Sequence, residues 1–116
     1  MGCGLGFLSV ALGAFGAHAL KTKLSTEMMA VYQTAVQYHQ VHALALLALV
    51  CLTPRLHNPT ATVAGWLFVA GTIVFSGSLY LLATTGTRWL GAITPIGGLA
   101  LLGGWACMLW AAFAKA

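Results

Sequence analysis

The sequence predicts an all-α membrane protein, an antiparallel bundle of four transmembrane helices. Of its 116 residues, 60% are hydrophobic and only 5% are charged, whereas an ordinary soluble domain has about 25% charged residues. A membrane crossing takes about 20 apolar residues, so the chain has room for four crossings joined by short loops. Its apolar runs are too long and continuous for barrel strands, and the backbone polar groups must therefore be satisfied within helices.

The first span is predicted over residues 4–20, an apolar segment rich in small residues. Lys21, Lys23 and the only acidic residue, Glu27, follow it. A secretory signal peptide would have a charged start and a cleavage-like polar stretch leading to a soluble domain. The segment has neither feature, so we interpret it as a membrane span.

The second span is predicted over residues 30–53, because Thr53 precedes Pro54 and a residue before proline disfavours the helical conformation. Its first half is unusually polar and its second half is apolar. The third span is predicted over residues 62–84, before a turn that contains Gly86.

The fourth span is predicted over residues 95–113. Thr94 is a good N-cap, and Pro95 would then occupy the first helical position, where its missing N–H does no harm. Residues 89–93 are expected to lie along the membrane interface. Residues 1–116 thus form a single four-helix transmembrane domain.

Short loops make neighbouring helices antiparallel, which assigns each polar end to one of two membrane sides. Side A has both termini, and side B has the loops after the first and third spans. Side A holds Arg55, His57 and Lys115, and side B holds Lys21, Lys23, Glu27 and Arg88. Side B has three basic residues against two on side A, so the positive-inside rule predicts that side B faces the cytoplasm.

Polar side chains inside the spans concentrate in the half of the bundle near side B. Buried polar groups need partners in hydrocarbon, so we expect these side chains to meet in a polar pocket that opens toward side B. We also expect His18 or His39 to make a hydrogen bond with a hydroxyl group of the third or fourth span. The predicted pocket comprises His18, Gln37, His39, His42, Ser76, Ser78, Tyr80 and Thr94.

Three glutamines of the second span repeat at i, i+4 and i+7 and therefore share one helix face, nearly opposite His39 and His42. One pocket cannot satisfy both faces, so either the start of this helix reaches the headgroups or one face contacts another chain. Glycines mark close approaches between helices, which we interpret chiefly as packing within the chain and alternatively as an oligomer contact. The predicted partner contacts are Gln33, Gln37, Gln40, Gly13, Gly97 and Gly104.

Histidine chemistry offers the main alternative to a structural network. His39 and His42 are spaced to contact one metal ion, and histidine is a common haem ligand. Two-histidine haem ligation normally uses two helices, however, and His18 is expected near the side B surface, far from His42. We therefore predict structural hydrogen bonds with no cofactor and no metal. A bound haem, metal or quinone, or the handling of protons or substrate, remains as an alternative.

The chain is not expected to be an enzyme. Glu27 is the only side-chain carboxylate and lies in a loop, which excludes paired-carboxylate catalysis. No serine or cysteine has an evident base beside it, and no phosphate loop or HExxH zinc helix is present. Five scattered Lys and Arg residues make no basic patch, so nucleic acid is not an expected partner.

Four segments carry a resemblance to a known family: GAFGAHALK at 13–21, YQTAVQYHQVHALALL at 32–47, FSGSLYLL at 75–82 and ITPIGGLALLGGW at 93–105. Together they closely resemble the small YgdD-like membrane family, also known in animals as transmembrane protein 256. The resemblance implies a four-helix protein of bacterial inner membranes, and of mitochondria in eukaryotes, with no established activity.

The expected role is an accessory subunit or assembly factor of a larger membrane complex. The sequence support is the second polar face of the second span, together with the glycine-rich faces. The expected partners are the lipid bilayer and either another membrane subunit or a second copy of the chain. The alternatives are a small-ligand-binding membrane protein and a small oligomeric transporter.

Overall fold

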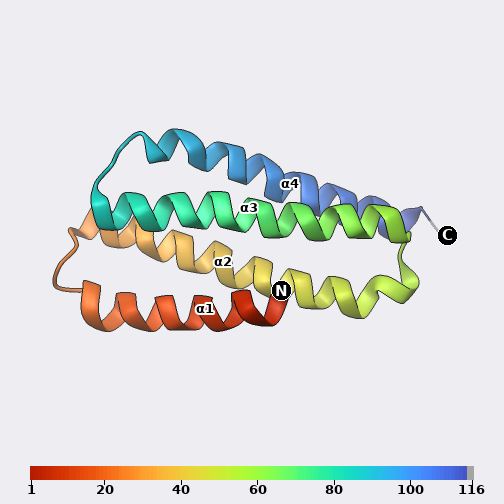
Figure 1. The fold of residues 1–116 in the computed structure, drawn as a ribbon, viewed down its shortest axis with the longest axis horizontal. Helices are drawn as coiled ribbons and strands as arrows, with labels where there is room; N and C mark the ends of the chain where they lie inside the picture. Colours follow the sequence, from red (N-terminus) through yellow and green to blue (C-terminus); the bar gives the residue numbers. More distant parts are fainter. Residues whose placement is uncertain (115–116) are drawn as a thin grey trace.

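The fold is an antiparallel bundle of four long helices, as predicted (Figure 1). The structure, a computed structural model, describes residues 1–114 except for the side chain of Asn58. Each helix is long and apolar enough to cross a membrane. The helices are α1 (Gly2–Phe15), continued by a π-helical turn η1 (Gly16–Leu20); α2 (Thr26–Leu52), continued by a 3-10 turn η2 (Thr53–Arg55); α3 (Asn58–Thr85); and α4 (Leu90–Phe113).

The bundle is flat and elongated, with extents of 51 × 26 × 16 Å. Figure 1 shows the α1–α2 and α3–α4 loops at one end, side B, and the α2–α3 connection with the last turn of α4 at the other, side A. Lys115, which was predicted for side A, lies outside the described residues. Helix α1 begins level with the last third of α2, where Gly2 packs against Leu47. The end of the bundle at side A therefore consists of α2, α3 and α4.

Helix boundaries follow local chemistry. Ser25 caps α2 by accepting a hydrogen bond from the backbone N–H of Met28 at 3.1 Å, and Gly86 ends α3 in the left-handed conformation with φ 71° that glycine adopts without strain. The predicted start of the fourth helix is wrong, because α4 begins at Leu90 and contains Pro95 in its interior. A proline this near the start removes one backbone donor while the remaining helical bonds persist.

The contacts between helices define the level of each residue in the membrane. Ser76 in α3 donates to the backbone carbonyl of Ala35 in α2 at 2.8 Å. One helical turn further toward side A, this register places Thr72 level with His39, and both residues lie near the middle of their helices. Across the other face of α3, Gly71 packs against Leu101 of α4 at the same level.

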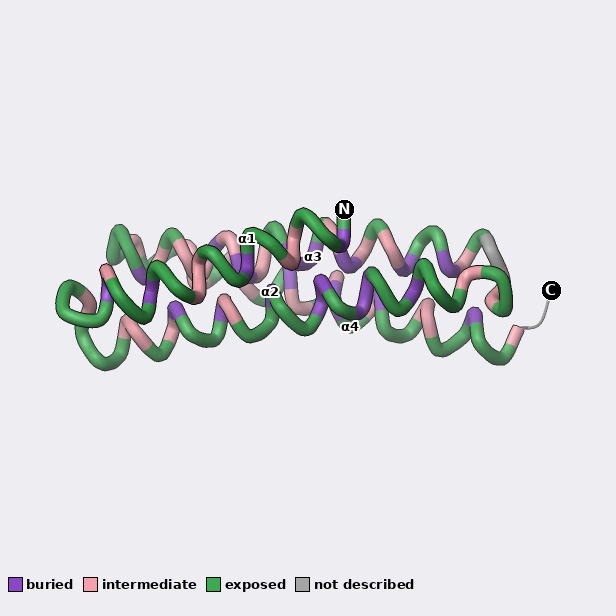
Figure 2. The backbone as a smooth tube through the Cα atoms, turned by 90° about the horizontal axis from the view of Figure 1, so that it is seen from below, coloured by how far each residue is buried: buried purple, intermediate pink, exposed green. Residues whose placement is uncertain are grey.

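Buried and exposed residues recur along every helix (Figure 2). The exposed ones include large apolar side chains on each of the helices. In the half near side A, Phe68 is fully buried, and a Cβ atom at Gly104 would lie 2.7 Å from its ring. Near side B, Tyr32 is buried beside Leu20 and Ala83. The outer apolar surface is the part of the bundle that the lipid contacts.

Candidate functional site

His42 is held between two helices with both ring nitrogens in hydrogen bonds. The indole N–H of Trp105 in α4 donates to Nε2 of His42 at 3.1 Å, and Nδ1 of His42 lies 2.7 Å from the backbone carbonyl of Tyr38. An indole N–H can only donate and a carbonyl can only accept, so the ring must be neutral with its proton on Nδ1. His42 therefore has no free lone pair for a metal ion or a haem iron in this arrangement.

His39 is also buried, and it connects α2 to α3. Its Nδ1 lies 3.0 Å from the hydroxyl oxygen of Tyr80, whereas its Nε2 is buried without a hydrogen-bond partner among the described residues. The hydroxyl of Thr72, at the same level of α3, is likewise buried and unpartnered. In the interior, therefore, both ring nitrogens of His42 are hydrogen-bonded, whereas only one ring nitrogen of His39 is.

Hydroxyl groups link the other helix pairs. The Tyr32 hydroxyl donates to the carbonyl of Leu12 in α1 at 2.6 Å. The hydroxyls of Ser78 and Thr94 lie 2.6 Å apart and join α3 to α4. Together with the bonds of His39, His42 and Ser76, these contacts form a series of pairs along the bundle interior.

The structure corrects two members of the predicted polar pocket. His18 is exposed in η1, because this turn buries Gly16 and Leu20 and leaves His18 on its outer face. Gln37 is exposed on the outer face of α2. The structure places the other six predicted residues in contacts between or within helices, as separate hydrogen-bonded pairs: His39, His42, Ser76, Ser78, Tyr80 and Thr94.

Sequence reasoning missed two partners in this network, Trp105 and Tyr32. Trp105 lies within an apolar run, where a tryptophan is expected to pack, and nothing in the sequence pairs it with His42. Tyr32 shares a helix face with His39, and that spacing was the signal that could have identified it. In the part of the chain that the structure describes, no group of three or more His, Cys, Asp or Glu side chains could hold a metal ion.

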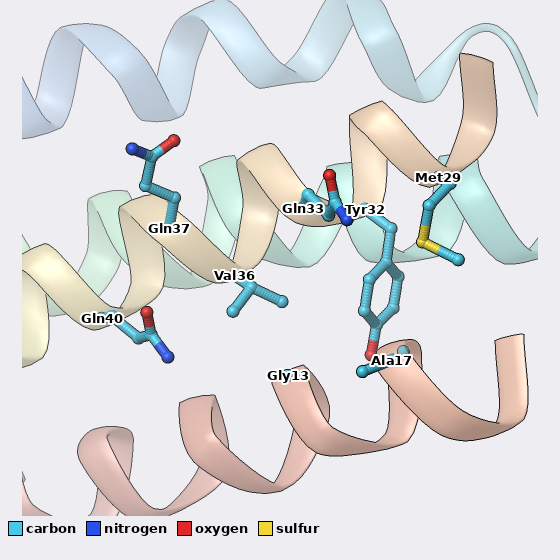
Figure 3. A pocket seen from close by; sticks show the side chains of 9 residues that line it. Gly13, Ala17, Met29, Tyr32, Gln33, Val36, Gln37 and Gln40 are labelled. Carbon is cyan, nitrogen blue, oxygen red and sulfur yellow. The ribbon is translucent and has the colours of Figure 1, made fainter. Parts of the chain in front are cut away.

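Gln33, Gln37 and Gln40 form an exposed ridge on α2, which we name the glutamine crest. None of the three amides makes a hydrogen bond with a described residue. The crest borders a groove of about 300 Å³ between α1 and α2, the α1–α2 groove, which is lined on the α1 side by Gly13, Gly16 and Ala17. Figure 3 shows that Gln40 points toward α1, whereas Gln37 points away from it.

A second and larger groove lies on the other side of the crest, between α2 and α4. This α2–α4 groove has a volume of about 830 Å³. Its lining is mainly apolar and aromatic and includes Gln37, Tyr38, His42, Phe75, Leu102 and Trp105. The glutamine crest therefore separates two grooves on one face of the bundle.

The predicted partner contacts at Gly97 and Gly104 are wrong, because both glycines are buried between α3 and α4. A Cβ atom at Gly97 would collide with the backbone of Phe75, and one at Gly104 would collide with Phe68. Gly13 also faces its own chain, at Val36 of α2. These glycines serve packing within the chain, which was the main interpretation of the sequence.

The comparisons with known proteins agree with this architecture. The family model described as "Protein of unknown function (DUF423)" matches residues 12–98. The UPF0382 membrane protein YwdK of Bacillus subtilis is 47% identical over 106 residues, which cover 90% of this chain and 86% of that protein.

The UPF0382 inner membrane protein YgdD of Escherichia coli is 41% identical over 104 residues, 90% of this chain and 79% of the relative. No solved structure matches the chain. The family model and both relatives cover most of the chain, and the resemblance seen in the four sequence segments is thereby confirmed. The chain belongs to the DUF423 family of small multi-pass membrane proteins, whose function is unknown.

Proposed function

We propose that this inner-membrane protein acts as an accessory subunit or assembly factor of a larger membrane complex, and that the glutamine crest is its contact surface. One observation carries the proposal: three exposed primary amides on a membrane-spanning helix have no hydrogen-bond partner among the described residues. An amide that faces hydrocarbon without a partner costs several kcal/mol. A second chain that supplies polar groups would remove this cost.

The depth of the crest favours a protein partner over lipid headgroups. Gln40 adjoins His39 near the middle of α2, and Gln33 lies seven residues nearer to side B, about 10 Å along the axis at 1.5 Å per residue. Headgroups and interfacial water can reach Gln33, whereas Gln40 is too deep for its short side chain to reach them. A polar group from a neighbouring transmembrane helix is the partner that fits this depth.

The surface beside the crest allows close approach of a helix. Gly13 and Ala17 leave the α1 side of the α1–α2 groove almost free of side chains. Small residues at a helix contact let backbones approach closely, and amide side chains then bond across the contact. The partner we expect is therefore a transmembrane helix with amide or hydroxyl side chains spaced three or four residues apart.

The described loops are too short to form a contact surface outside the membrane. Residues 21–25, 56–57 and 86–89 are the only described segments between the helical elements, and none is long enough to form a binding domain. Contact through helix faces is therefore the means of assembly that this part of the chain offers.

Photo-cross-linking in native membranes tests this proposal. A benzophenone amino acid at position 40 should form a discrete adduct with one membrane protein, identified by mass spectrometry. The matched control is position 73 on α3, where Ile73 is 61% exposed and lies at the same depth. Adducts with lipid alone at position 40, or the same protein adduct at both positions, would contradict the proposal.

A further inference from the structure

We propose that the α2–α4 groove binds an uncharged, planar, lipid-soluble molecule with carbonyl oxygens, a molecule of the quinone class. Its volume of about 830 Å³ is within the range of about 300–1,000 Å³ that small-molecule sites occupy. The groove also combines a mainly apolar lining with a few polar groups, which is typical of such sites. The groove shares Gln37 with the glutamine crest, and the rest of its lining takes no part in the proposed docking role.

The walls of the groove suit a flat ring. The rings of Tyr38 and Phe75 have centroids 4.4 Å apart, and Trp105 packs edge-on against Phe68 with centroids 5.1 Å apart. The hydrogen bond from Trp105 to His42 fixes the indole ring in the wall. Aromatic side chains held in this way present faces and edges on which a planar ligand packs.

The polar groups of the groove determine the chemistry of the ligand. The Gln37 amide and the Tyr38 hydroxyl both line it, and neither makes a hydrogen bond with a described residue. Both groups can donate to carbonyl oxygens, and both can accept from the hydroxyls of a reduced ring. The acyl chain of a phospholipid has no such atoms at this depth and would leave both groups unpaired.

The lining of the groove has no charged side chain to pair with an ionic ligand. Gln37, Tyr38 and Trp105 are uncharged, and the two hydrogen bonds of His42 hold it in the neutral form. A phosphate or carboxylate in this groove would be a buried unpaired charge. Leu99 and Leu102, which are 69% and 67% exposed, extend the apolar surface along α4 and suit an isoprenoid or alkyl tail.

Tryptophan quenching by decylubiquinone in lipid nanodiscs tests the site. In a variant that retains Trp105 and carries W66F, W89F and W110F, quenching should saturate as the quinone-to-lipid ratio rises. A variant that retains only Trp66, 60% exposed on α3, lacks the Trp105 wall of the groove and reports quenching from the surrounding lipid, so it should show a linear decrease without saturation. Unsaturable quenching of Trp105 would overturn the proposal.

Substitutions then test the named groups. Gln37→Leu and Tyr38→Phe should each weaken binding about three- to tenfold, because each removes one hydrogen bond. Gln33→Leu is the control, since it removes a crest amide that does not line this groove. Circular dichroism and gel filtration show whether each variant is folded. Equal weakening by all three variants would contradict the assignment.

Competition identifies other occupants. Decylbenzene has a ring and the same tail without carbonyl oxygens, and it should compete at least tenfold more weakly than decylubiquinone. Equal competition would mean that the groove accepts apolar chains in general and would overturn the proposal. Quinone binding that disappears when single copies per disc are prepared would place the site between two copies of the chain and would overturn the proposal. Cross-linking at position 40 is unaffected by either result, so the two proposals fail separately.

Discussion

Trp105 in α4 donates its indole N–H to Nε2 of His42 in α2, across 63 positions of the sequence. The bond joins two helices that are not consecutive in the chain and determines the tautomer of the histidine. Solid-state NMR of ¹⁵N-histidine protein should therefore show a neutral His42 ring with the proton on Nδ1. A His42 signal that shows the ring protonated on Nε2 would mean that Trp105 is not its donor.

Removing this donor should destabilise the bundle by a modest amount. Trp105→Phe leaves Nε2 of His42 buried and unpaired, with an expected loss of about 1–3 kcal/mol. His42→Leu removes the acceptor, and the double variant should lose less than the sum of the two single variants. Unfolding in mixed micelles measures this, and strictly additive losses would argue against the bond.

Removal of two buried hydroxyls should have different effects on the free energy of unfolding. Ser76 donates to the Ala35 carbonyl, so Ser76→Ala should lower the free energy of unfolding by about 0.6 kcal/mol, the average for membrane hydrogen bonds. The Thr72 hydroxyl is buried without a partner among the described residues, so Thr72→Val should be neutral or stabilising. The same unfolding assay compares them, and a larger loss for Thr72→Val would reveal a partner for that hydroxyl.

Glycine substitutions should separate packing positions from open ones. A methyl group at Gly97 would collide with the backbone of Phe75, whereas a Cβ at Gly77 meets no atom of the described residues within 4 Å. Gly97→Ala should therefore cost about 1–3 kcal/mol, and Gly77→Ala should stay within about 0.5 kcal/mol of wild type. Equal stabilities would contradict the packing of α3 against α4.

Membrane orientation follows from the loops. Lys21, Lys23 and Arg88 lie on side B, so this side should face the cytoplasm with both termini outside. A reporter fused to the C-terminus should then be active only as a periplasmic enzyme. Activity of a cytoplasm-dependent reporter at the same position would reverse the orientation.

Much of the fold could be predicted from the sequence, because the length and apolarity of the spans leave few alternatives for 116 residues in a bilayer. The start of α4 could not be predicted from Thr94 and Pro95, because the same two residues are compatible with a helix that starts at Pro95 and with one that starts a turn earlier. Packing of α4 on α3 decides between these two starts.

The candidate site was predictable only in part. Helical spacing placed His39 and Gln40 on different faces, and the structure confirms that one is buried and the other exposed. The partners of these side chains depend on which helices are neighbours and in what register. His18 was assigned to the interior for this reason, although α1 packs along α2 and leaves it exposed.

Gentle extraction from native membranes, followed by quantitative mass spectrometry, tests the central claim of an interaction subunit most directly. The wild-type chain should co-purify with a membrane protein in a constant ratio, and a chain with Gln33→Leu, Gln37→Leu and Gln40→Leu should lose that partner while remaining folded. Exposed leucines are compatible with lipid, so the triple variant should insert normally. A wild-type chain that purifies alone, or a triple variant that retains the same partner in the same ratio, would contradict the role of the glutamine crest.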